Sequence, residues 1–442
     1  MQSKSGTKAI LCAVLVLAVG LSIFLFHWNA NQPTSGDVAP SQLSPAAVSP
    51  AERESMPSVS SPENASGVEL LTDATLEDSG NALAKAFRDL LEKPGIVPGE
   101  LLLKFRYASD IAALRSRAGS LGLSVLWSDS RVTAARIAYT DPEALAEELQ
   151  SNGDAYEDFG PNFEMRIPGL PPEPELDSNN PGGTVPFRET LMESIGADRN
   201  RSQWGSEVTV AILDSGILDH PSLANVGITR MDLSSSGEIH GHGTAMASLV
   251  AGQLYPAEGI APAASLLDLR VTDGNGVTNT GLVAQGILAA ADQRVDVINI
   301  SLGSFGDSSV LRAAIEYALE RNIIVIAAAG NEQTTRLAFP AAYGGVISVG
   351  AVDAENTQAY FSNSGETLSI SAPGVGIFSA YEGGKLVLGS GTSQATAITS
   401  GVVAALLSQG YRPGEIPGIL QKHAYRTGAP REQVGAGVIQ VP

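Results

Sequence analysis

Three short blocks in the second half of the chain each place a reactive side chain beside small residues. Asp214 closes an apolar run, and His242 and Ser393 each stand beside glycine and threonine. A carboxylate, an imidazole and a hydroxyl can work as one unit: the serine attacks a carbonyl, the histidine carries its proton and the aspartate orients the imidazole. These residues predict a nucleophilic centre for acyl transfer, provided that the fold brings them together.

The reactive residues need a scaffold, and the surrounding sequence predicts one. From about residue 188, near-continuous apolar runs alternate with helical patterns such as 281–292 and 309–321. Uniformly apolar runs are typical of strands that are buried on both faces of a parallel sheet. Five such runs are Val208–Leu213, Leu266–Val271, Val295–Ser301, Ile323–Ala328 and Val346–Ala351. The pattern predicts an α/β domain with a doubly wound, mostly parallel sheet, whose site should lie at the carboxyl ends of the strands.

Two features of the composition limit the function classes. The net charge of −20 at pH 7 disfavours nucleic acid as a partner, because binding it needs clustered Lys and Arg. The one cysteine is Cys12, so neither a disulfide framework nor a thiolate metal site is expected in the rest of the 442 residues. We expect no cofactor and no metal at the active site.

The first 28 residues predict a membrane-directed segment. Lys4 and Lys8 precede the uncharged stretch Ala9–Phe26, whose length suits a short transmembrane helix or a long signal peptide. The positive flank on the N-terminal side directs the remainder of the chain away from the cytoplasm. Trp28 suits a membrane interface and no small-x-small cleavage site follows, which favours an uncleaved anchor over a cleaved signal peptide. We expect the protein outside the cytoplasm, anchored to the membrane, or secreted if the segment is cleaved.

Between this segment and the larger domain, the sequence predicts a tether, a small domain and a linker. Residues 29–94 are rich in Ser, Pro and Ala and predict a flexible tether. Residues 95–167 follow the order strand, helix, strand, strand, helix, strand, which is the ferredoxin-like α+β pattern. Asp141, followed by proline, marks one helix start. Residues 168–187 predict an exposed, cleavable linker to the domain at 188–442.

The region at 188–442 resembles the subtilisin-like serine proteases, the subtilase family. In that family the catalytic residues follow the order aspartate, histidine, serine. The blocks that carry the resemblance are Asp214-Ser-Gly216, His242-Gly-Thr244, Asn299-Ile-Ser-Leu-Gly303, Ala329-Gly330-Asn331 and Gly391-Thr-Ser393. The resemblance implies that Ser393 is the nucleophile, His242 the general base and Asp214 its orienting carboxylate. It also implies that the Asn331 amide and the Ser393 backbone N–H form the oxyanion hole.

His240 competes with His242 for the role of base. Only His242 is followed by Gly-Thr and opens a stretch of small residues that predicts a helix. The other motif residues also have purely structural interpretations: a helix cap for Ser393, and turns for Asp214 and Asn331. The order of the blocks along the chain favours the catalytic interpretation.

The resemblance further implies where a polypeptide substrate binds. Two segments match the family strands that pair with an extended peptide. They consist of Ser301, Leu302 and Gly303, and of Gly276, Val277 and Thr278. Ala338, with Ala327–Gly330, would wall the pocket for the residue before the scissile bond. These residues are small and uncharged, which implies an apolar preference, but Glu332 nearby leaves that preference open.

Residues 95–167 are similar to the family's N-terminal propeptide, which assists folding and then inhibits the enzyme with its last strand in the substrate cleft. The stretch Pro161-Asn162-Phe163 suits such a strand. The resemblance implies a zymogen that cuts itself and whose own propeptide domain is an intramolecular inhibitor. Bound calcium is common in the family. The sequence shows no clear acidic ligand cluster, so calcium as a structural ion stays open.

The sequence therefore predicts a hydrolase of the serine endopeptidase class that acts on polypeptides. Two alternatives stay open. A catalytically silent subtilisin-like fold would serve as a binding or scaffold module, although such proteins normally lose a residue of the triad and this chain keeps all of them. A peptide ligase or cyclase would use the same site to transfer the acyl group to an amine.

Overall fold

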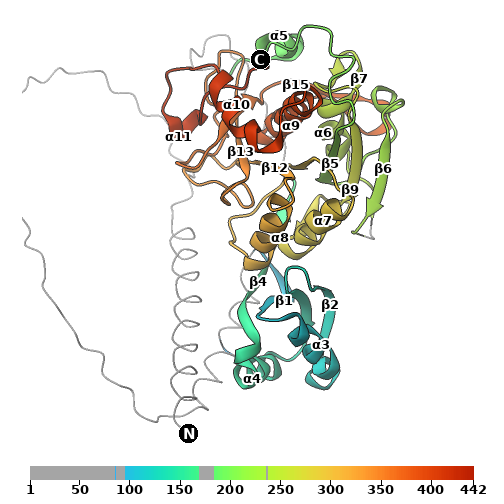
Figure 1. Ribbon diagram of the computed structural model, residues 1–442, viewed down its shortest axis with the longest axis vertical. Helices are drawn as coiled ribbons and strands as arrows, with labels where there is room; N and C mark the ends of the chain where they lie inside the picture. The colour runs from blue at the N-terminus through green and yellow to red at the C-terminus, as the bar shows by residue number, and fades with distance from the viewer. Residues whose placement is uncertain (1–84, 86–94, 169–183, 235–236) are drawn as a thin grey trace, which may run out of the picture. The chain divides into compact units, whose positions relative to one another are not determined.

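The computed structural model describes Lys85 and residues 95–168, 184–234 and 237–442 (Figure 1). The membrane segment expected at 1–28, the expected tether apart from Lys85, and most of the expected linker lie outside these residues. Within the described ranges, no helix is long and apolar enough to cross a membrane. Residues Leu83–Pro442 form one compact unit, which holds both folded parts of the chain.

The N-terminal domain is a four-stranded antiparallel sheet with two helices. Its strands are β1 (Ile96–Phe105), β2 (Leu123–Asp129), β3 (Ala134–Tyr139) and β4 (Tyr156–Arg166). They pair in the order β4-β1-β3-β2. Its helices are α3 (Ala108–Arg117) and α4 (Pro142–Ser151). This order and pairing confirm the predicted ferredoxin-like α+β fold.

The second helix of this domain forms where the sequence offers a cap and an apolar face. The Asp141 carboxylate accepts hydrogen bonds from the backbone N–H groups of Glu143 and Ala144 and so caps α4. Leu145 and Leu149, one turn apart, are buried in the apolar cluster that the helices share with the sheet. Each such leucine stabilises the domain by about 1.5–3 kcal/mol, which fixes the face that α4 presents to the strands.

The larger domain is built on a seven-stranded parallel sheet. Its strands are β5 (Thr209–Asp214), β6 (Ile228–Asp232), β9 (Ser265–Arg270), β11 (Val297–Ile300), β12 (Ile324–Ala328), β13 (Ile347–Val352) and β14 (Ile370–Pro373). Their order across the sheet is β14-β13-β12-β11-β5-β9-β6, and every neighbouring pair is parallel. The structure confirms the five strands that the apolar runs predict, which are β5, β9, β11, β12 and β13.

The two edge strands, β6 and β14, are not among the apolar runs. β6 has the sequence Ile-Thr-Arg-Met-Asp, and its residues are all at least partly exposed. An edge strand has a neighbour on one side only, so polar side chains are tolerated there. β14 has four residues and ends in Pro373, which lacks the N–H that a further ladder bond would need. Strands this polar or this short give no continuous apolar signal.

Four long helices cover the two faces of the parallel sheet. They are α6 (His242–Ala251), α7 (Thr280–Asp292), α8 (Ser309–Leu319) and α9 (Thr392–Ser408). α6 and α9 share one core cluster with Val210 and Ile212 of β5. α7 and α8 share the other cluster with Ala211 and Leu213. Alternate residues of β5 therefore face opposite helix layers, which explains its uniformly apolar sequence and confirms the doubly wound arrangement (Figure 1).

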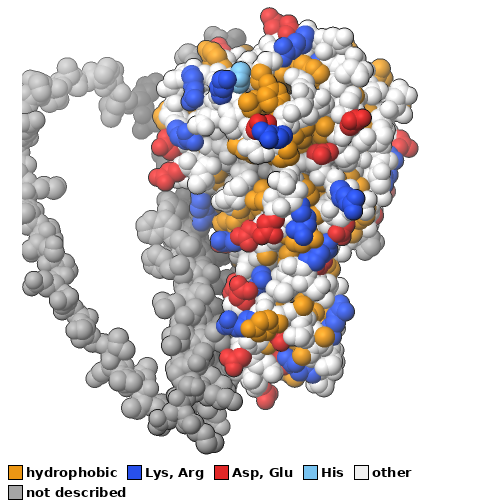
Figure 2. All heavy atoms as spheres, viewed as in Figure 1, with side chains coloured by type: hydrophobic (Ala, Val, Ile, Leu, Met, Phe, Trp, Pro, Cys, Tyr) orange, Lys and Arg blue, Asp and Glu red, His pale blue; other side chains and the backbone are white. Residues whose placement is uncertain are grey.

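The remaining elements are short. They are α5 (Leu191–Ser194), β7 (Gln253–Leu254), β8 (Ala257–Glu258), β10 (Val277–Asn279), β15 (Ile377–Ala380), β16 (Leu386–Gly389), α10 (Ile416–His423) and α11 (Arg431–Val434). Of these, β10 pairs antiparallel with β4 and extends the sheet of the N-terminal domain to five strands. Figure 2 shows acidic and basic side chains interspersed where the two folded parts meet, and one ion pair across this contact joins Arg131 to Asp292.

Candidate active site

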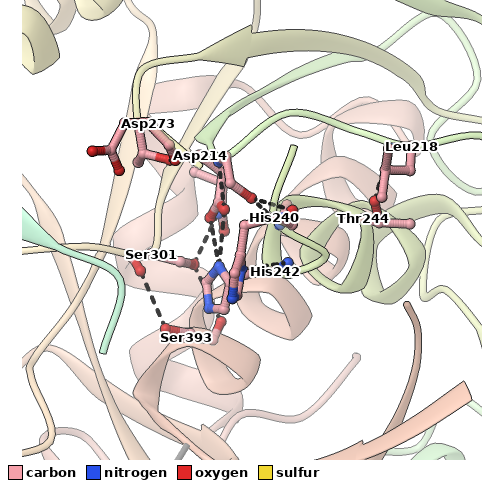
Figure 3. Close-up of polar contacts among 12 residues, drawn as sticks. Asp214, Leu218, His240, His242, Thr244, Asp273, Ser301 and Ser393 are labelled. Carbon is pink, nitrogen blue, oxygen red and sulfur yellow. Dashed lines mark hydrogen bonds and ion pairs between the residues drawn. The ribbon is translucent and has the colours of Figure 1, made fainter. Parts of the chain in front are cut away.

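The first two residues of the expected triad lie where β5 ends and α6 begins. Asp214 is the last residue of β5 and is fully buried, and His242 is the first residue of α6. The His242 Nδ1 atom lies 2.9 Å from each carboxylate oxygen of Asp214 (Figure 3). Because an ionised carboxylate only accepts hydrogen bonds, Nδ1 carries the hydrogen and Nε2 keeps a lone pair. The pair is arranged to take up a proton at Nε2.

The turn after Asp214 packs directly against the start of α6. The Ser215 hydroxyl accepts a hydrogen bond from the Gly243 N–H at 3.0 Å. A Cβ at position 243 would stand 2.5 Å from the Gly216 carbonyl oxygen, closer than any side chain tolerates. The glycine after His242 is therefore required by the close approach of the turn to the helix.

His240 takes no part in the Asp214 pair. Its Nδ1 accepts a hydrogen bond from the His242 backbone N–H at 3.2 Å, and its carbonyl accepts one from the Ser215 hydroxyl at 2.6 Å. Its ring stands edge-on to Tyr381, with 6.1 Å between the ring centroids. Of the two histidines in this stretch, the structure brings only His242 to the carboxylate.

Two side chains hold the next residues of the same turn. The Asp268 carboxylate on β9 accepts a hydrogen bond from the Ile217 N–H at 3.0 Å. The Thr244 hydroxyl on α6 accepts one from the Leu218 N–H at 2.8 Å. The position of the turn is thus fixed both from the neighbouring strand and from the helix that carries His242.

Asp268 is a buried acid that the expected site did not include. Asp268 is 4% exposed, and its Oδ1 atom has no hydrogen-bond partner among the described residues. Burial raises the pKa of this carboxyl to about 6; the Asp214 and Asp232 charges add to the rise, whereas the Ile217 N–H and Arg230 oppose it. The signal available in the sequence is an acid, Asp268, between leucines in the otherwise mostly apolar run Leu266–Val271.

Ser393 is the second residue of α9 and is 2% exposed. Because α9 begins at Thr392, Ser393 lies in the first turn of the helix. The Ser393 hydroxyl donates to the Ser301 carbonyl at 3.2 Å, and no hydrogen bond joins it to His242 among the residues described. Figure 3 shows the His242 ring between Asp214 and Ser393. The structure gathers the three residues, with the hydroxyl turned to Ser301.

Asn331 follows β12 and is tied to the residue before Ser393. Its Oδ1 atom accepts from the Thr392 N–H at 2.9 Å and from the Thr392 hydroxyl at 2.8 Å. A backbone N–H can only donate, which identifies the contacting atom as the amide oxygen. The Nδ2 group therefore faces away from Thr392 and keeps its hydrogens for another acceptor.

Both segments expected to bind substrate contact the end of β4. Val277–Asn279 of β10 pair antiparallel with Glu164–Arg166. The Gly276 carbonyl accepts a hydrogen bond from the Ile167 N–H at 2.9 Å. On the other side, Gly303 forms an antiparallel bridge with the last residue of β4. The end of β4, the last strand of the N-terminal domain, therefore lies between the two segments.

Ala338 lies against the second of these segments. Its N–H donates to the Ala329 carbonyl at 2.9 Å, and a Cβ on Gly303 would stand 3.0 Å from its methyl group. The Glu332 carboxylate accepts a hydrogen bond from the Asn363 side-chain amide at 2.8 Å. The structure thus brings Ala338 beside Gly303, and the Asn363 amide binds the Glu332 carboxylate.

No three His, Cys, Asp or Glu side chains stand together as metal ligands within the described residues. The carboxylates of Asp273 and Asp353, which are oxygen donors of the kind calcium prefers, each accept two backbone N–H groups of their own turns. Backbone donors thus already engage these two carboxylates.

Comparison with known proteins identifies relatives of the larger domain. The Subtilase family model matches residues 205–437, which is more than half of the chain. The Thermostable alkaline protease of Halalkalibacterium halodurans is 39% identical over 231 residues, which cover 51% of this chain and 63% of that protein. Subtilisin Savinase of Lederbergia lenta is 37% identical over 230 residues, which cover 51% of this chain and 85% of that protein. The chain spans less than two thirds of the first relative.

Two solved structures are similar to this one. Fervidolysin from Fervidobacterium pennivorans matches with a TM-score of 0.66 at 23% identity, over 79% of this chain and 61% of that chain. This share exceeds what residues 188–442 alone make up, so the shared fold extends N-terminal of residue 188. A mutant of the protease domain of PatA matches with a TM-score of 0.50 at 31% identity, over 53% of this chain and 92% of that domain. Together with the site geometry, these matches establish that the chain belongs to the subtilase family.

Proposed function

We propose that the chain is a serine endopeptidase that hydrolyses polypeptides, with Ser393 as nucleophile, His242 as general base and Asp214 as the orienting carboxylate. The observation that carries the proposal is the contact of both Asp214 oxygens with His242 Nδ1 at 2.9 Å, in a chain of the subtilase family. A carboxylate on Nδ1 fixes the tautomer in which Nε2 is basic. It also stabilises the imidazolium that forms once Nε2 has taken a proton.

The first chemical step moves the Ser393 hydroxyl from its resting partner to the histidine. In the structure this hydroxyl donates to the Ser301 carbonyl at 3.2 Å. A rotation about the Cα–Cβ bond turns it toward His242 Nε2, which takes the proton as the oxygen attacks the substrate carbonyl. The proton then passes to the leaving amine as the peptide bond breaks. Water, activated by the same imidazole, hydrolyses the acyl ester left on Ser393.

The oxyanion formed in this step needs donors that are in place before the reaction. The Asn331 Nδ2 group is one, because Thr392 already holds the amide oxygen of Asn331. The Ser393 N–H is the second, since the first N–H groups of a helix have no partner within the helix and carry its positive dipole end. One such donor contributes about 2.7–4 kcal/mol to the stability of a transition state.

Substrates would bind as an extended strand between the segments 276–278 and 301–303. The support is that the end of β4 already pairs with both segments in this way. Backbone hydrogen bonds of an antiparallel ladder give affinity that does not depend on the substrate's side chains. We assign the preference for an apolar residue before the scissile bond to Ala338 and its small neighbours, because the Glu332 carboxylate already accepts a hydrogen bond from Asn363.

We also propose that the chain is made as an inactive precursor that its own site converts. Residues 164–167 form backbone pairs with a segment that a substrate would use. The N-terminal domain therefore excludes substrates from the site of the uncut chain. A cut within the linker at 168–187 would free this domain to leave. The domain would then act as an intramolecular inhibitor before the cut and as a dissociable one after it.

We place the activity outside the cytoplasm. The support is the basic and apolar sequence of residues 1–28, and one relative, of Bacillus subtilis, is named Minor extracellular protease Epr. N-terminal sequencing of the protein recovered from cells separates the two modes of export. In the uncut Ser393→Ala chain, which keeps its N-terminal domain, retention of Lys4 indicates a membrane anchor, and a start just after residue 28 indicates a cleaved signal peptide.

Digestion of casein tests the proposed activity. The purified full chain, after maturation, should produce peptides whose summed masses exceed the parent by one water for each cut. Ser393→Ala should produce none. Products joined without gain of water would assign the site to a ligase or cyclase. An intact chain that neither cuts casein nor its own linker would identify a silent binding module, and either result contradicts the endopeptidase proposal.

A further inference from the structure

The end of β4 lies between the two substrate segments, 276–278 and 301–303, in a defined register. Arg166 pairs with Val277 on one side and bridges Gly303 on the other, both antiparallel. The next N–H, that of Ile167, donates to the Gly276 carbonyl at 2.9 Å. The strand therefore runs along Gly303 toward Ser301 as its own residue numbers rise.

This register identifies the residue that faces the nucleophile. In an antiparallel pair, moving two residues forward on one strand moves two residues back on the other. Continuing this register two residues beyond the bridge between Arg166 and Gly303 puts Pro168 opposite Ser301. Ser301 is the residue whose carbonyl accepts the Ser393 hydroxyl at 3.2 Å. Pro168 is thus the residue of the chain's own strand that arrives at Ser393.

Proline is the one residue that cannot complete the ladder at this point. Any other residue opposite Ser301 could donate its N–H to the Ser301 carbonyl, but proline has no N–H and a fixed φ near −65°. Consistent with this, β4 ends at Arg166, and the Ser301 carbonyl accepts the Ser393 hydroxyl instead. While that bond persists, the hydroxyl is turned away from its proposed base, His242.

We propose that Pro168 determines where the chain cuts itself, by withholding the peptide bond that follows it from Ser393. The inference rests on the proposed endopeptidase function. With proline at position 168, the other backbone hydrogen bonds still hold the strand in the cleft. The strand lacks the hydrogen bond that would position the Pro168 carbonyl for attack by Ser393. The N-terminal domain then acts as an inhibitor at this register, and the maturation cut falls further along the linker.

The test compares full-length chains that differ at one proline. Pro168→Ala restores the missing N–H, and the matched control Pro161→Ala restores one in the same strand opposite Leu101, away from Ser301. We expect Pro168→Ala to convert about tenfold faster than wild type, the effect of one added hydrogen bond. Its new product should end at residue 168 by intact mass. Pro161→Ala should convert like wild type, and the wild-type cut should lie beyond residue 169.

Two results would overturn the inference. One is a wild-type cut between residues 168 and 169, and the other is a Pro168→Ala chain that converts at the wild-type rate. A fluorophosphonate probe run in parallel separates failure of this inference from failure of the proposed function. If Ser393 is labelled but Pro168→Ala converts at the wild-type rate, only this inference is wrong. If no matured chain is labelled, the proposed function and this inference are both wrong. Synthetic peptides of residues 162–171 with Pro or Ala at 168 give the same comparison independently of folding. The matured enzyme should cut the alanine peptide after residue 168 and leave the proline peptide intact there.

Discussion

At the scale of single residues, each reactive group is held by a neighbour that fixes its direction. Both Asp214 oxygens hold His242 by Nδ1, and Thr392 holds Asn331 by its amide oxygen. Ser393 differs, because its hydroxyl rests on the Ser301 carbonyl and must rotate before it reacts. We therefore expect Asn331 and His242 to stay in place during the reaction while the Ser393 side chain rotates.

Asn331→Leu should lower kcat by about 10²–10³-fold and leave KM nearly unchanged. The reason is that an oxyanion donor acts on the charge that develops in the transition state and not on the bound substrate. Kinetics with a chromogenic peptide on the matured enzyme measure both constants. The exposed Asn200→Ala is the control and should behave as wild type. An unchanged kcat in Asn331→Leu would remove Asn331 from the oxyanion hole.

At the scale of elements, the site is built from strand ends and helix starts. β5 ends at Asp214, α6 begins at His242 and α9 begins one residue before Ser393. The turn after β5 is held by Ser215 and by the buried carboxylate of Asp268. Backbone groups at these junctions have no partners within their own element, so side chains bind them there and fix the geometry.

The Asp268 carboxylate makes folding stability depend on pH. Its pKa is raised to about 6 in the folded chain, so the fold favours the protonated form. The stabilisation is fully present below the unfolded pKa of about 4 and is lost as pH rises through about 6. Asp268→Asn removes the ionisation and should raise the unfolding free energy at about pH 8 by on the order of 2–3 kcal/mol relative to its effect at about pH 4.

Chemical denaturation at both pH values measures this difference, with Ser393→Ala in every chain to prevent self-digestion. Asp198→Asn serves as the control, because it makes the same substitution at an exposed position. An equal effect of Asp268→Asn at both pH values would show that the Asp268 carboxyl does not titrate with a raised pKa.

The strands that the sequence predicts are those whose residues face apolar layers on both sides. Runs such as 208–213 are apolar because alternate residues meet different helix layers. β6, in contrast, is a partly exposed edge strand, and its composition matches a loop equally well. Pairing of β10 with β4 joins residues more than 100 positions apart and depends on how the two folded parts meet, which local patterns do not encode.

The candidate site divides in the same way. Asp214, His242, Ser393 and Asn331 could be named from motif order, because each motif includes the small residues that its close contacts demand, as Gly243 does against Gly216. The rotamer of Ser393 and the role of Asp268 could not be predicted. Both depend on neighbours from distant segments, namely the Ser301 carbonyl and the Ile217 N–H.

At the scale of the whole molecule, the N-terminal domain is fastened to the larger domain beside the substrate segments. Asn162 of β4 is fully buried, and its amide oxygen accepts from the Gly281 N–H at 2.9 Å and the Thr280 hydroxyl at 3.0 Å. Its Nδ2 group donates to Glu100 at 2.7 Å. One side chain of the N-terminal domain thus binds the first turn of α7 in the larger domain.

Asn162→Ala should loosen this contact and expose the site before any cut. Two lost hydrogen bonds weaken the holding free energy by about 1–3 kcal/mol, which is about tenfold or more in the open fraction. The rate of fluorophosphonate labelling of the uncut chain should rise by that factor. Asn152→Ala, whose side chain contacts Glu148 within the N-terminal domain, should leave the rate unchanged. Equal rates in both variants would show that Asn162 does not control closure.

Covalent labelling shows directly whether Ser393, activated by His242, is the nucleophile. The matured protein is treated with a fluorophosphonate, and the adduct is located by peptide mass mapping; variants that do not cut themselves are first matured by added wild-type enzyme and separated from it. We predict a single adduct on Ser393, retained in His240→Ala and lost in His242→Ala, because of these two histidines only His242 contacts Asp214. An adduct on another residue, no adduct at all, or an undiminished adduct in His242→Ala would contradict it.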